Sequence, residues 1–575
     1  MEVSTFGICQ VREQRQMLSN LAFRQMRIPF SFVSVVLLAA VTYILHKSAL
    51  SGYWRYDDGL HLAFVARYSP WQYFFVPSIT SLQSGGKFFT PWNAFFYDVN
   101  LWLFGLNPKG FYAHQLIVLW LSSVATFVFL RLWTRDGWAL FGAVILLSNA
   151  ATVHIAQELM DGHYAAGLLF AIIALYGYVL SMRKQHWWPA LIGALFYLLA
   201  LMCKEIYFPL IGILPFLPEG KMKSRLRFSL PYGLVALVYI PWRFVVLNGG
   251  IGGHTPGLIT HITYNEMWRI IKDFFYLPQL LLGGAAFVYT MLLAVSIDYF
   301  CKRRNRLPIL IVGLFLTLTP LAPLWLGKIE RFDIFFWWSL SIYFTILLST
   351  WEKPRTLRCL LAVLILALSL QTWYKEMYSS DGSKAIRDCH DAASKFILNS
   401  NSQQVLYDSL NVWYPASDVV ISLVEAEKEL YPLSPRRGPV ISDPDSLNSL
   451  LNKATIWGYN DQCRCMEDIT SKVPSLILDF RKKQYERPLF IHVKYEQEKV
   501  FWEVGPYGDG IYVVVFVNSN ASAMTLPAIK GTAAFDISRK IDFYLRYKSP
   551  NGWMTRSPNF HYAPASDPEL SWSRK

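Results

Sequence analysis

Two adjacent carboxylates, Asp57 and Asp58, directly follow the first long apolar run of the chain. Ionised side chains are costly close to the apolar interior of a bilayer, so a carboxylate pair at this point indicates chemistry at a membrane surface. One carboxylate could take the proton of an acceptor hydroxyl as a general base. The pair could instead hold a divalent cation together with waters and phosphate oxygens. Taken alone, the pair is more simply a helix cap or a solvated loop.

Other polar residues fall in segments that we expect on the same side of the membrane. Cations among them could stabilise the charge on a departing phosphate, and a phosphate leaving group needs no proton. The candidate substrate contacts are His61, Glu158, Lys204, Glu205, Glu330 and Arg331. Taken alone, the dipeptides Lys204-Glu205 and Glu330-Arg331 are surface ion pairs worth little energy, and His61 is a surface or satisfied buried histidine.

Composition assigns the protein to the membrane class. Hydrophobic residues make up 53% of the 575 and charged residues only 16%, and apolar runs of membrane-spanning length recur through the first two thirds of the chain. The net charge of +14 comes from short Lys and Arg clusters between these runs, as the positive-inside rule predicts. Nucleic-acid binding, which would gather the cations on one face or tail, is not indicated.

The basic clusters set the direction of each span. Four arginines precede the first apolar run (Arg12, Arg15, Arg24 and Arg27), so we expect a cytoplasmic N-terminus and a carboxylate pair on the extracytoplasmic side. No A-x-A cleavage site follows the first run, which predicts a retained anchor. About eleven spans are predicted, over residues 28–46, 111–132, 138–153, 164–180, 188–203, 206–217, 228–247, 274–299, 307–326, 334–350 and 360–373. The odd count places the C-terminal region outside.

Three regions follow from this pattern: a cytoplasmic segment (1–27), a multi-pass membrane part (28–375) and an extracytoplasmic soluble α/β domain (376–575). Within the last we expect a helix over 383–398 and short strands over 475–480, 488–495, 500–504, 510–517 and 540–546. The loops 432–444 and 518–522 suit subdomain boundaries. One disulfide is predicted there, joining Cys389 to Cys463 or Cys465. The Cys-x-Cys pair without a companion pair is a poor zinc signal.

The order of several motifs along the chain is more specific than any one of them. These are Tyr56-Asp57-Asp58, Phe89-Thr90-Pro91-Trp92-Asn93, Phe104-Gly105-Leu106-Asn107-Pro108, Lys204-Glu205 and Glu330-Arg331. Over roughly residues 28–375, this succession resembles the transmembrane O-mannosyltransferases with tetratricopeptide repeats and their bacterial relatives. Those enzymes belong to the GT-C superfamily of glycosyltransferases, which depend on polyprenyl-phosphate sugars. No helical repeat follows residue 374, so the resemblance implies nothing about the acceptor.

The resemblance implies a GT-C-type polytopic α-helical membrane protein that moves a sugar from a polyprenyl-phosphate donor to an acceptor outside the membrane. The acceptor stays open between a glycan, a lipid and a protein, and attack opposite the leaving phosphate predicts inversion at the anomeric carbon. The catalytic acidic residue maps onto Asp57 or Asp58, which would also be the ligands of any divalent metal; no other cofactor is expected. Lys204 and Arg331 map onto phosphate contacts. Cys203 and Phe332 replace a serine and a tyrosine of the family pattern. A bacterial inner membrane is favoured over the endoplasmic reticulum.

Other functions fit parts of the same pattern. A polysaccharide polymerase or ligase is the nearest enzymatic alternative, although such enzymes usually place their working residues in a large late loop. A polytopic transporter would show charges near the middle of spans, on both sides of a central site. A non-catalytic scaffold would retain the membrane fold and a closed, apolar cavity beside Asp57.

Overall fold

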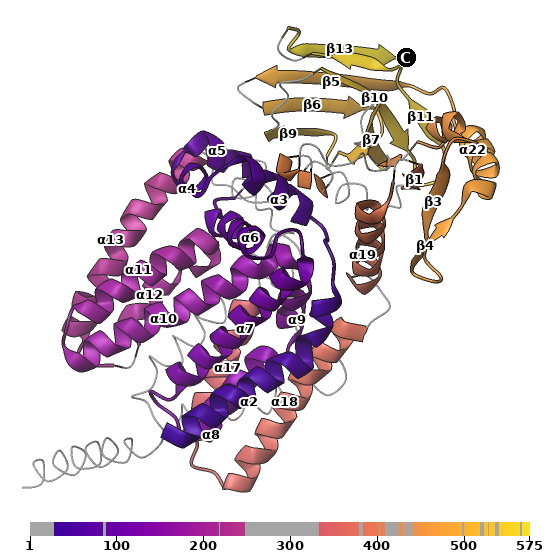
Figure 1. Ribbon diagram of the computed structural model, residues 1–575. Coiled ribbons are helices and arrows are strands. Elements are labelled where there is room, and N and C mark those ends of the chain that lie inside the picture. The colour runs from indigo at the N-terminus through magenta and orange to yellow at the C-terminus, as the bar shows by residue number, and fades with distance from the viewer. Residues whose placement is uncertain are drawn as a thin grey trace, which may run out of the picture.

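The structure is a computed structural model. It describes residues 28–575 apart from 248–332 and several short segments, chiefly 84–87, 379–382, 409–421, 432–439, 518–522 and 535–539. Figure 1 shows a helical part, built from the N-terminal two thirds of the chain, with strand-rich layers lying beyond one end of it. The predicted class, a polytopic helical protein with a C-terminal α/β domain, is confirmed.

Long apolar helices build the membrane part. They are α2 (Ile28–His46), α7 (Pro108–Leu130), α8 (Asp136–Leu147), α9 (Ala150–Gln157), α10 (Gly162–Lys184), α11 (Trp188–Cys203), α13 (Met222–Val246), α17 (Asp333–Thr350) and α18 (Arg355–Tyr378). Among the described residues, five helices are long and apolar enough to cross a membrane by themselves, and α8 with α9 forms a further, bent candidate. The protein is an integral membrane protein. The predicted spans 274–299 and 307–326 lie outside the described residues.

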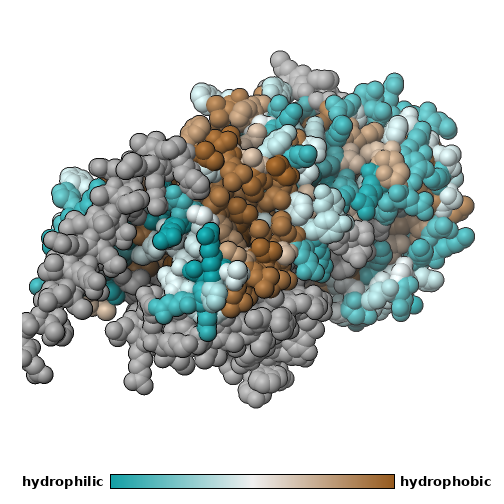
Figure 2. All heavy atoms as spheres, turned by 90° about the horizontal axis from the view of Figure 1, so that it is seen from below, coloured by the Kyte–Doolittle hydropathy of each residue, from teal (hydrophilic) through white to brown (hydrophobic). Residues whose placement is uncertain are grey.

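The apolar surface of the bundle agrees with this assignment. Large apolar side chains are exposed along α2, α11, α13 and α18, for example Phe32, Ile192, Leu237 and Val363. Seen from below, hydrophobic residues form a broad region across the middle of the molecule (Figure 2). Such a surface is expected to face lipid rather than water.

Small residues allow the helices to approach closely. Gly177 of α10 lies against α11, where a Cβ would come within 2.6 Å of the Pro189 carbonyl oxygen. Gly193 of α11 lies against α10 in turn, and a Cβ there would be 2.9 Å from the Ala174 carbonyl oxygen. Glycine at both positions therefore sets the distance between α10 and α11, as is common between helices in a bilayer.

The predicted span 138–153 is bent by 58° between α8 and α9. The bend frees backbone carbonyls, which side chains from other helices satisfy. His46 of α2 contacts the Leu147 carbonyl oxygen at 2.9 Å, and Ser369 of α18 donates to the Ser148 carbonyl oxygen at 2.8 Å. The bend is thus held from two sides, and it directs α9 toward the end of the bundle where Glu158 lies.

Shorter helices cover that end. They are α3 (Asp58–Arg67), α4 (Pro70–Phe75), α5 (Pro77–Leu82) and α6 (Pro91–Phe104). The segment 206–217, predicted as one span, instead forms short pieces: η4 (Glu205–Tyr207), α12 (Leu210–Ile213) and η5 (Leu214–Phe216). Pro209 and Pro215 lie within it, and proline lacks the amide donor that a continuous helix requires.

The C-terminal region begins with a small α/β unit. Helix α19 (Ser383–Asn399), predicted from the sequence, is followed by a sheet of order β2-β1-β3-β4, with α21 (Pro444–Leu447) and α22 (Val473–Lys482). The strands are β1 (Gln404–Tyr407), β2 (Val440–Ile441), β3 (Thr455–Asn460) and β4 (Cys465–Asp468). The prediction of a strand over 475–480 is wrong. That segment lies in α22, which buries Val473, Ile477 and Phe480 on one face at helical spacing.

Two antiparallel sheets complete the chain. One has the order β13-β5-β6-β9 and the other β11-β10-β7-β8, with β12 also paired to β10. Their strands are β5 (Leu489–Glu496), β6 (Lys499–Gly505), β7 (Ile511–Phe516), β8 (Ala523–Thr525), β9 (Lys530–Ala534), β10 (Ile541–Lys548), β11 (Met554–Arg556), β12 (Phe560–Tyr562) and β13 (Glu569–Arg574). Residues such as Ile491, Trp502 and Leu545 from both sheets share one buried cluster. The four strands predicted within 488–546 are confirmed.

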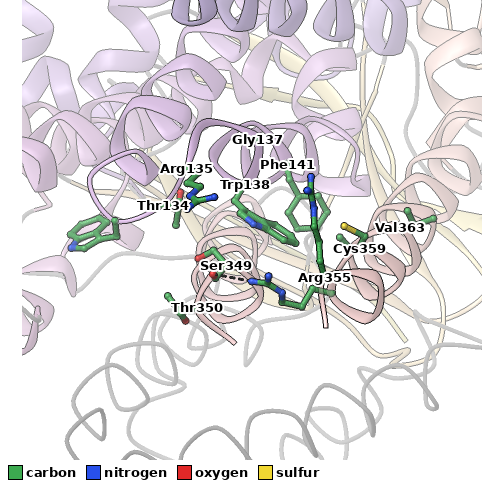
Figure 3. A pocket seen from close by; sticks show the side chains of 13 residues that line it. Thr134, Arg135, Gly137, Trp138, Phe141, Ser349, Thr350, Arg355, Cys359 and Val363 are labelled. Carbon is green, nitrogen blue, oxygen red and sulfur yellow. Dashed lines mark hydrogen bonds between the residues drawn. The ribbon is translucent and has the colours of Figure 1, made fainter. Parts of the chain in front are cut away.

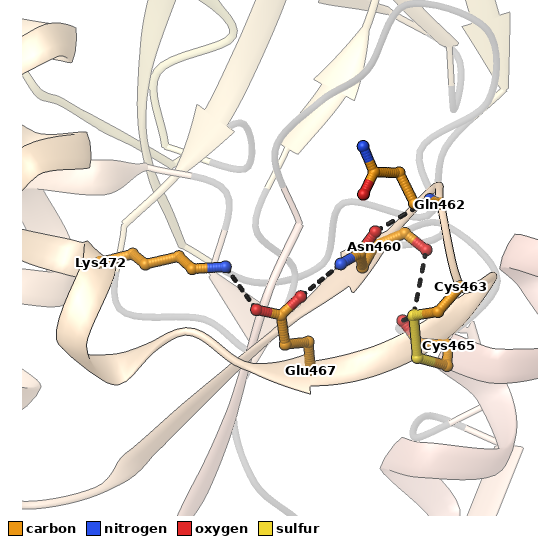
Figure 4. Close-up of a disulfide and its surroundings, with 6 residues drawn as sticks. All are labelled: Asn460, Gln462, Cys463, Cys465, Glu467 and Lys472. Carbon is orange, nitrogen blue, oxygen red and sulfur yellow. Dashed lines mark hydrogen bonds and ion pairs between the residues drawn. A yellow bond between two sulfur atoms is a disulfide. The ribbon is translucent and has the colours of Figure 1, made fainter.

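The predicted disulfide partner is wrong. Cys463 and Cys465 are joined to each other across the turn between β3 and β4, with their Cα atoms 5.3 Å apart (Figure 4). Cys389 of α19 is a free thiol, and burial raises its pKa to about 12. The turn between β3 and β4 places Cys463 beside Cys465, which the sequence spacing did not reveal.

Candidate functional site

The two predicted catalytic carboxylates lie at the start of α3 but in different environments. Asp57 precedes the helix, its side chain is exposed and it makes no capping hydrogen bond to the helix. Asp58 is the first helical residue and is fully buried. Asp58 Oδ2 accepts a hydrogen bond from the Arg55 amide at 2.7 Å, and Oδ1 is 2.5 Å from the Tyr97 hydroxyl, which donates to it. Of the pair, Asp57 is therefore the carboxylate that a substrate can reach.

Burial changes the ionisation of Asp58. It raises the pKa of this carboxyl to about 8, because desolvation outweighs the hydrogen bonds from Tyr97 and Arg55. Near neutral pH Asp58 is thus largely protonated and poorly suited to act as a base. Its contacts instead connect α3 to α6.

This ionisation predicts a pH dependence of stability. Protonation of the buried Asp58 stabilises the folded protein. This stabilisation is complete at pH values below 3.8, the pKa of the carboxyl in the unfolded chain, and it is lost as the pH rises through about 8, the pKa in the folded protein. Between these values the free energy of unfolding should fall by about 1.4 kcal/mol per pH unit relative to Asp58→Asn, which mimics the neutral acid. Melting temperatures of both proteins in detergent between about pH 5 and pH 8 measure the difference. Parallel curves would contradict the prediction.

His61, a predicted substrate contact, lies one turn further along α3 and is buried. Asn93 Nδ2 of α6 donates to its Nε2 at 3.1 Å, and its ring lies 4.9 Å from the Tyr97 ring. Burial lowers the pKa of His61, which favours the neutral ring. Like Asp58, His61 therefore fixes α3 on α6, beside the exposed carboxylate of Asp57.

Arg55 joins the carboxylate segment to two other parts of the chain. Its guanidinium forms two hydrogen bonds with Asp391 of α19, Nε to Oδ1 at 2.6 Å and Nη2 to Oδ2 at 2.5 Å. Nη1 donates to the carbonyl of Gln157, the residue before Glu158. The Tyr53 amide also donates to Asp391, at 3.1 Å. A buried arginine thus positions the first external segment against both α9 and the C-terminal region.

Other residues of α19 hold the same segment. The Tyr56 amide donates to His390 Nδ1 at 3.2 Å, and the two rings meet edge to face. Tyr56 has a φ of 45°, which side-chain-bearing residues rarely adopt, so this contact supports an unfavourable backbone conformation directly before Asp57. Ser394 donates to the Trp54 carbonyl oxygen at 2.9 Å. We call residues 53–56 together with His390, Asp391 and Ser394 the α19 clamp.

Glu158, another predicted substrate contact, is buried in a second polar cluster. Its Oε1 lies 3.1 Å from His154 Nδ1, one turn earlier, and 3.8 Å from Arg387 Nη1 of α19. Arg387 also lies 3.6 Å from Glu376 Oε1. Among the described residues, His154, Glu158 and Asp161 form one group whose ligand atoms all lie within 4.8 Å of one another. One nitrogen and two carboxylates suit a divalent cation, although Arg387 competes for Glu158.

Lys204, a predicted phosphate contact, is buried and surrounded by aromatic rings. Its Nζ lies 3.6 Å from the centre of the Phe88 ring and 5.9 Å from that of Tyr164. Such rings attract a cation and restrict its position. Glu205 is less buried and pairs with Arg243 of α13 at 3.6 Å. The predicted contacts Glu330 and Arg331 lie outside the described residues.

The structure therefore brings most of the predicted residues to one end of the bundle. Helix α6 and the residues just before it connect them, since Asn93 and Tyr97 contact α3 while Phe88 contacts Lys204. Sequence reasoning missed Arg55, Tyr97, His154 and the clamp residues of α19. The spacing of His154 and Glu158, four apart on a helix, was a usable signal. The others carried none, because their partners are distant in sequence.

Comparisons with known proteins give distant structural matches. No protein-family model and no curated protein matches the chain. Among solved structures, ArnT from Cupriavidus metallidurans bound to undecaprenyl phosphate matches with 14% identity and a TM-score of 0.40, covering 77% of this chain and 94% of ArnT. The archaeal oligosaccharyltransferase AglB from Archaeoglobus fulgidus, in complex with an inhibitory peptide and a dolichol-phosphate, matches with 11% identity and a TM-score of 0.46, covering 88% of this chain and 75% of AglB. At these identities and TM-scores the matches assign neither a family nor a residue role to this chain.

Proposed function

We propose that the protein is a membrane glycosyltransferase that moves a sugar from a polyprenyl-phosphate donor to an acceptor on the extracytoplasmic face. The observation that carries this proposal is the contrast within the aspartate pair. Asp58 is buried, held by two hydrogen bonds and largely neutral, while the adjacent Asp57 is exposed on a segment held from several sides. A reactive carboxylate on a rigid support is what general-base catalysis requires.

In the proposed reaction, Asp57 takes the proton of an acceptor hydroxyl. The acceptor oxygen attacks the anomeric carbon, the bond from this carbon to the phosphate oxygen breaks, and polyprenyl phosphate leaves with the bonding electrons. Attack opposite the leaving group inverts the anomeric carbon. Lys204 binds the donor phosphate and stabilises the charge that develops on it.

The cluster of His154, Glu158 and Asp161 could hold a divalent cation, which would supply further positive charge for phosphate binding. In this proposal Glu158 acts through that cluster. Arg387, which lies 3.8 Å from Glu158, provides a protein cation at the same place. The chain's own residues thus offer cationic groups at this end of the bundle with or without a metal.

The placement of buried charges favours an enzyme over a transporter. Among the described residues, the buried charged side chains of the membrane part lie at helix ends or in the connecting segments, as Asp58, Asp136, Asp161 and Lys204 do. A transporter with a central site would be expected to carry charges near the middle of its spans. We further propose the topology predicted from the basic clusters, with a cytoplasmic N-terminus and residues 376–575 outside a bacterial inner membrane.

Glycan profiling of cells with and without the intact gene tests the proposed function. Deletion should remove one sugar from a surface glycan, lipid or protein, and the wild-type gene should restore it. The identity of the missing sugar would name the donor, and the molecule that lacks it would name the acceptor. An unchanged glycan profile together with altered solute uptake would favour the transporter.

Lys204→Met should weaken donor binding. Methionine retains an apolar side chain between the rings of Phe88 and Tyr164 but removes the charge. Loss of a charge-assisted contact to phosphate of about 1.5–3 kcal/mol should raise the KM for the lipid-linked donor by about 10- to 100-fold. Lys109→Met is the matched control, since Lys109 is exposed at the start of α7, near the same end of the bundle. An unchanged KM in Lys204→Met would remove Lys204 from the proposed site.

A further inference from the structure

A second polar site lies at the opposite end of the bundle. A cavity of about 800 Å³ opens between the turn that joins α7 to α8, the end of α17 and the start of α18 (Figure 3). It is lined by Arg135, Arg355 and Arg358 together with hydroxyl and aromatic side chains, including Thr134, Ser349 and Trp138. We call this cavity the arginine pocket.

No acidic side chain is among the described residues that line the arginine pocket. The nearby Asp136 is already paired with Arg131, its Oδ1 lying 2.9 Å from Arg131 Nε. Arg358 Nη1 donates to the carbonyl oxygens of Leu348 and Ser349 at the end of α17, at 3.3 Å each. These contacts orient the guanidinium but supply no negative charge.

Arg358 also has unused bonding capacity. Its Nε is buried and has no hydrogen-bond partner among the described residues. Arg135 and Arg355 are exposed at the rim. Three guanidinium groups thus lie beside one cavity, and guanidinium N–H groups are well suited to donate to the oxygens of a phosphate group.

The position of the pocket suggests where such a phosphate comes from. Helix α7, of 23 residues, is about 35 Å long at 1.5 Å per residue, so the arginine pocket lies about one bilayer thickness from the aspartate pair. Trp133 and Trp138 at this end are typical of the headgroup region. Phe141 and Val363 line the cavity on its apolar side, where the start of an acyl chain would lie.

We propose that the arginine pocket binds the phosphate of an anionic phospholipid from the leaflet opposite the aspartate pair. Basic pockets between membrane-spanning helices are suited to anionic headgroups. A lipid bound in the arginine pocket would hold together the helix ends that line it, those of α7, α8, α17 and α18. This site is separate from the proposed donor site and does not depend on the proposed function.

Binding of short-chain lipids to delipidated protein tests the proposal. Dioctanoyl phosphatidylglycerol should raise the melting temperature and appear as a retained adduct in native mass spectrometry, whereas dioctanoyl phosphatidylcholine should do neither at the same concentration. The double variant Arg135→Gln/Arg355→Gln should weaken binding of the anionic lipid at least tenfold. Lys221→Gln/Lys223→Gln, which removes the same charge from exposed residues beside the start of α13, should bind as the wild type does.

Three outcomes would overturn the proposal. Equal binding of the two lipids would show that charge is not recognised. Undiminished binding to Arg135→Gln/Arg355→Gln would place the lipid elsewhere. Inorganic phosphate that competes as strongly as the whole lipid would assign the pocket to a soluble phosphate compound rather than to a membrane lipid.

Discussion

Asp57→Asn is expected to reduce sugar transfer by about 10²- to 10⁴-fold, the usual contribution of a general base. Asparagine has the shape of aspartate but cannot accept the proton of the acceptor hydroxyl. Purified protein and a labelled polyprenyl-phosphate sugar provide the measurement, with single-turnover rates to separate chemistry from binding. The KM for the donor should change little, because Lys204 rather than Asp57 is proposed to bind the phosphate.

The same variant should fold normally, which makes the comparison informative. The Asp57 side chain is exposed and forms no capping hydrogen bond with α3, so its replacement should leave the melting temperature within about 1–2 °C of the wild type. Asp58→Asn is the internal control. Asparagine at position 58 resembles the neutral carboxyl that already contacts Tyr97 and Arg55. Asp58→Asn should therefore retain most of the activity. Full activity in Asp57→Asn would contradict the role of Asp57 as the general base. A complete loss of activity in Asp58→Asn but not in Asp57→Asn would assign that role to Asp58.

Asp391→Asn is expected to destabilise the protein and slow transfer, although it lies in the C-terminal region. It leaves the buried Arg55 guanidinium, only 6% exposed, without its ionic partner. Breaking a buried ion pair costs about 3–5 kcal/mol, and we expect the lower end because Asp391 is itself 25% exposed. Thermal unfolding in detergent measures this effect. The transfer rate should fall as well, since the α19 clamp supports the segment that presents Asp57.

An exposed ion pair provides the matched control for Asp391. Lys530 and Glu503 lie 2.7 Å apart on neighbouring strands, with side chains 70% and 40% exposed. Lys530→Gln should cost less than about 1 kcal/mol and leave transfer unchanged. If Asp391→Asn is as mild as Lys530→Gln, the α19 clamp does not position the first external segment. Limited proteolysis provides a second readout, because a released segment 53–56 should be cleaved faster in Asp391→Asn than in Lys530→Gln.

The C-terminal region contacts the membrane part at further residues besides the α19 clamp. Leu423 and Ala426 are buried in the same core as the membrane helices, and a Cβ at Gly59 of α3 would lie 2.7 Å from the Leu423 amide nitrogen. The C-terminal region is therefore packed directly over α3. We infer that its removal would expose and loosen the helix that carries the aspartate pair.

Hydropathy and charge along the chain were enough to predict the class of protein and many of its helices. The ranges predicted over 28–46 and 188–203 coincide with α2 and α11, and the helix over 383–398 with α19. These features depend on residues close together in sequence, since a membrane span, its basic flank and an amphipathic helix are each set by a local pattern. The aspartate pair stood out for the same reason.

Only the tertiary structure decided what those residues contact. Arg55 and Asp391 are separated by 336 positions in the sequence, and no local pattern pairs them. The burial that separates Asp58 from Asp57 comes in part from α6, whose Tyr97 contacts Asp58. The strand wrongly expected over 475–480 is a different case, because Val473, Ile477 and Phe480 already stand at helical spacing in the sequence. Burial, ion pairing and proton affinity depend on which distant segments meet, so they follow from the fold rather than from the order of residues.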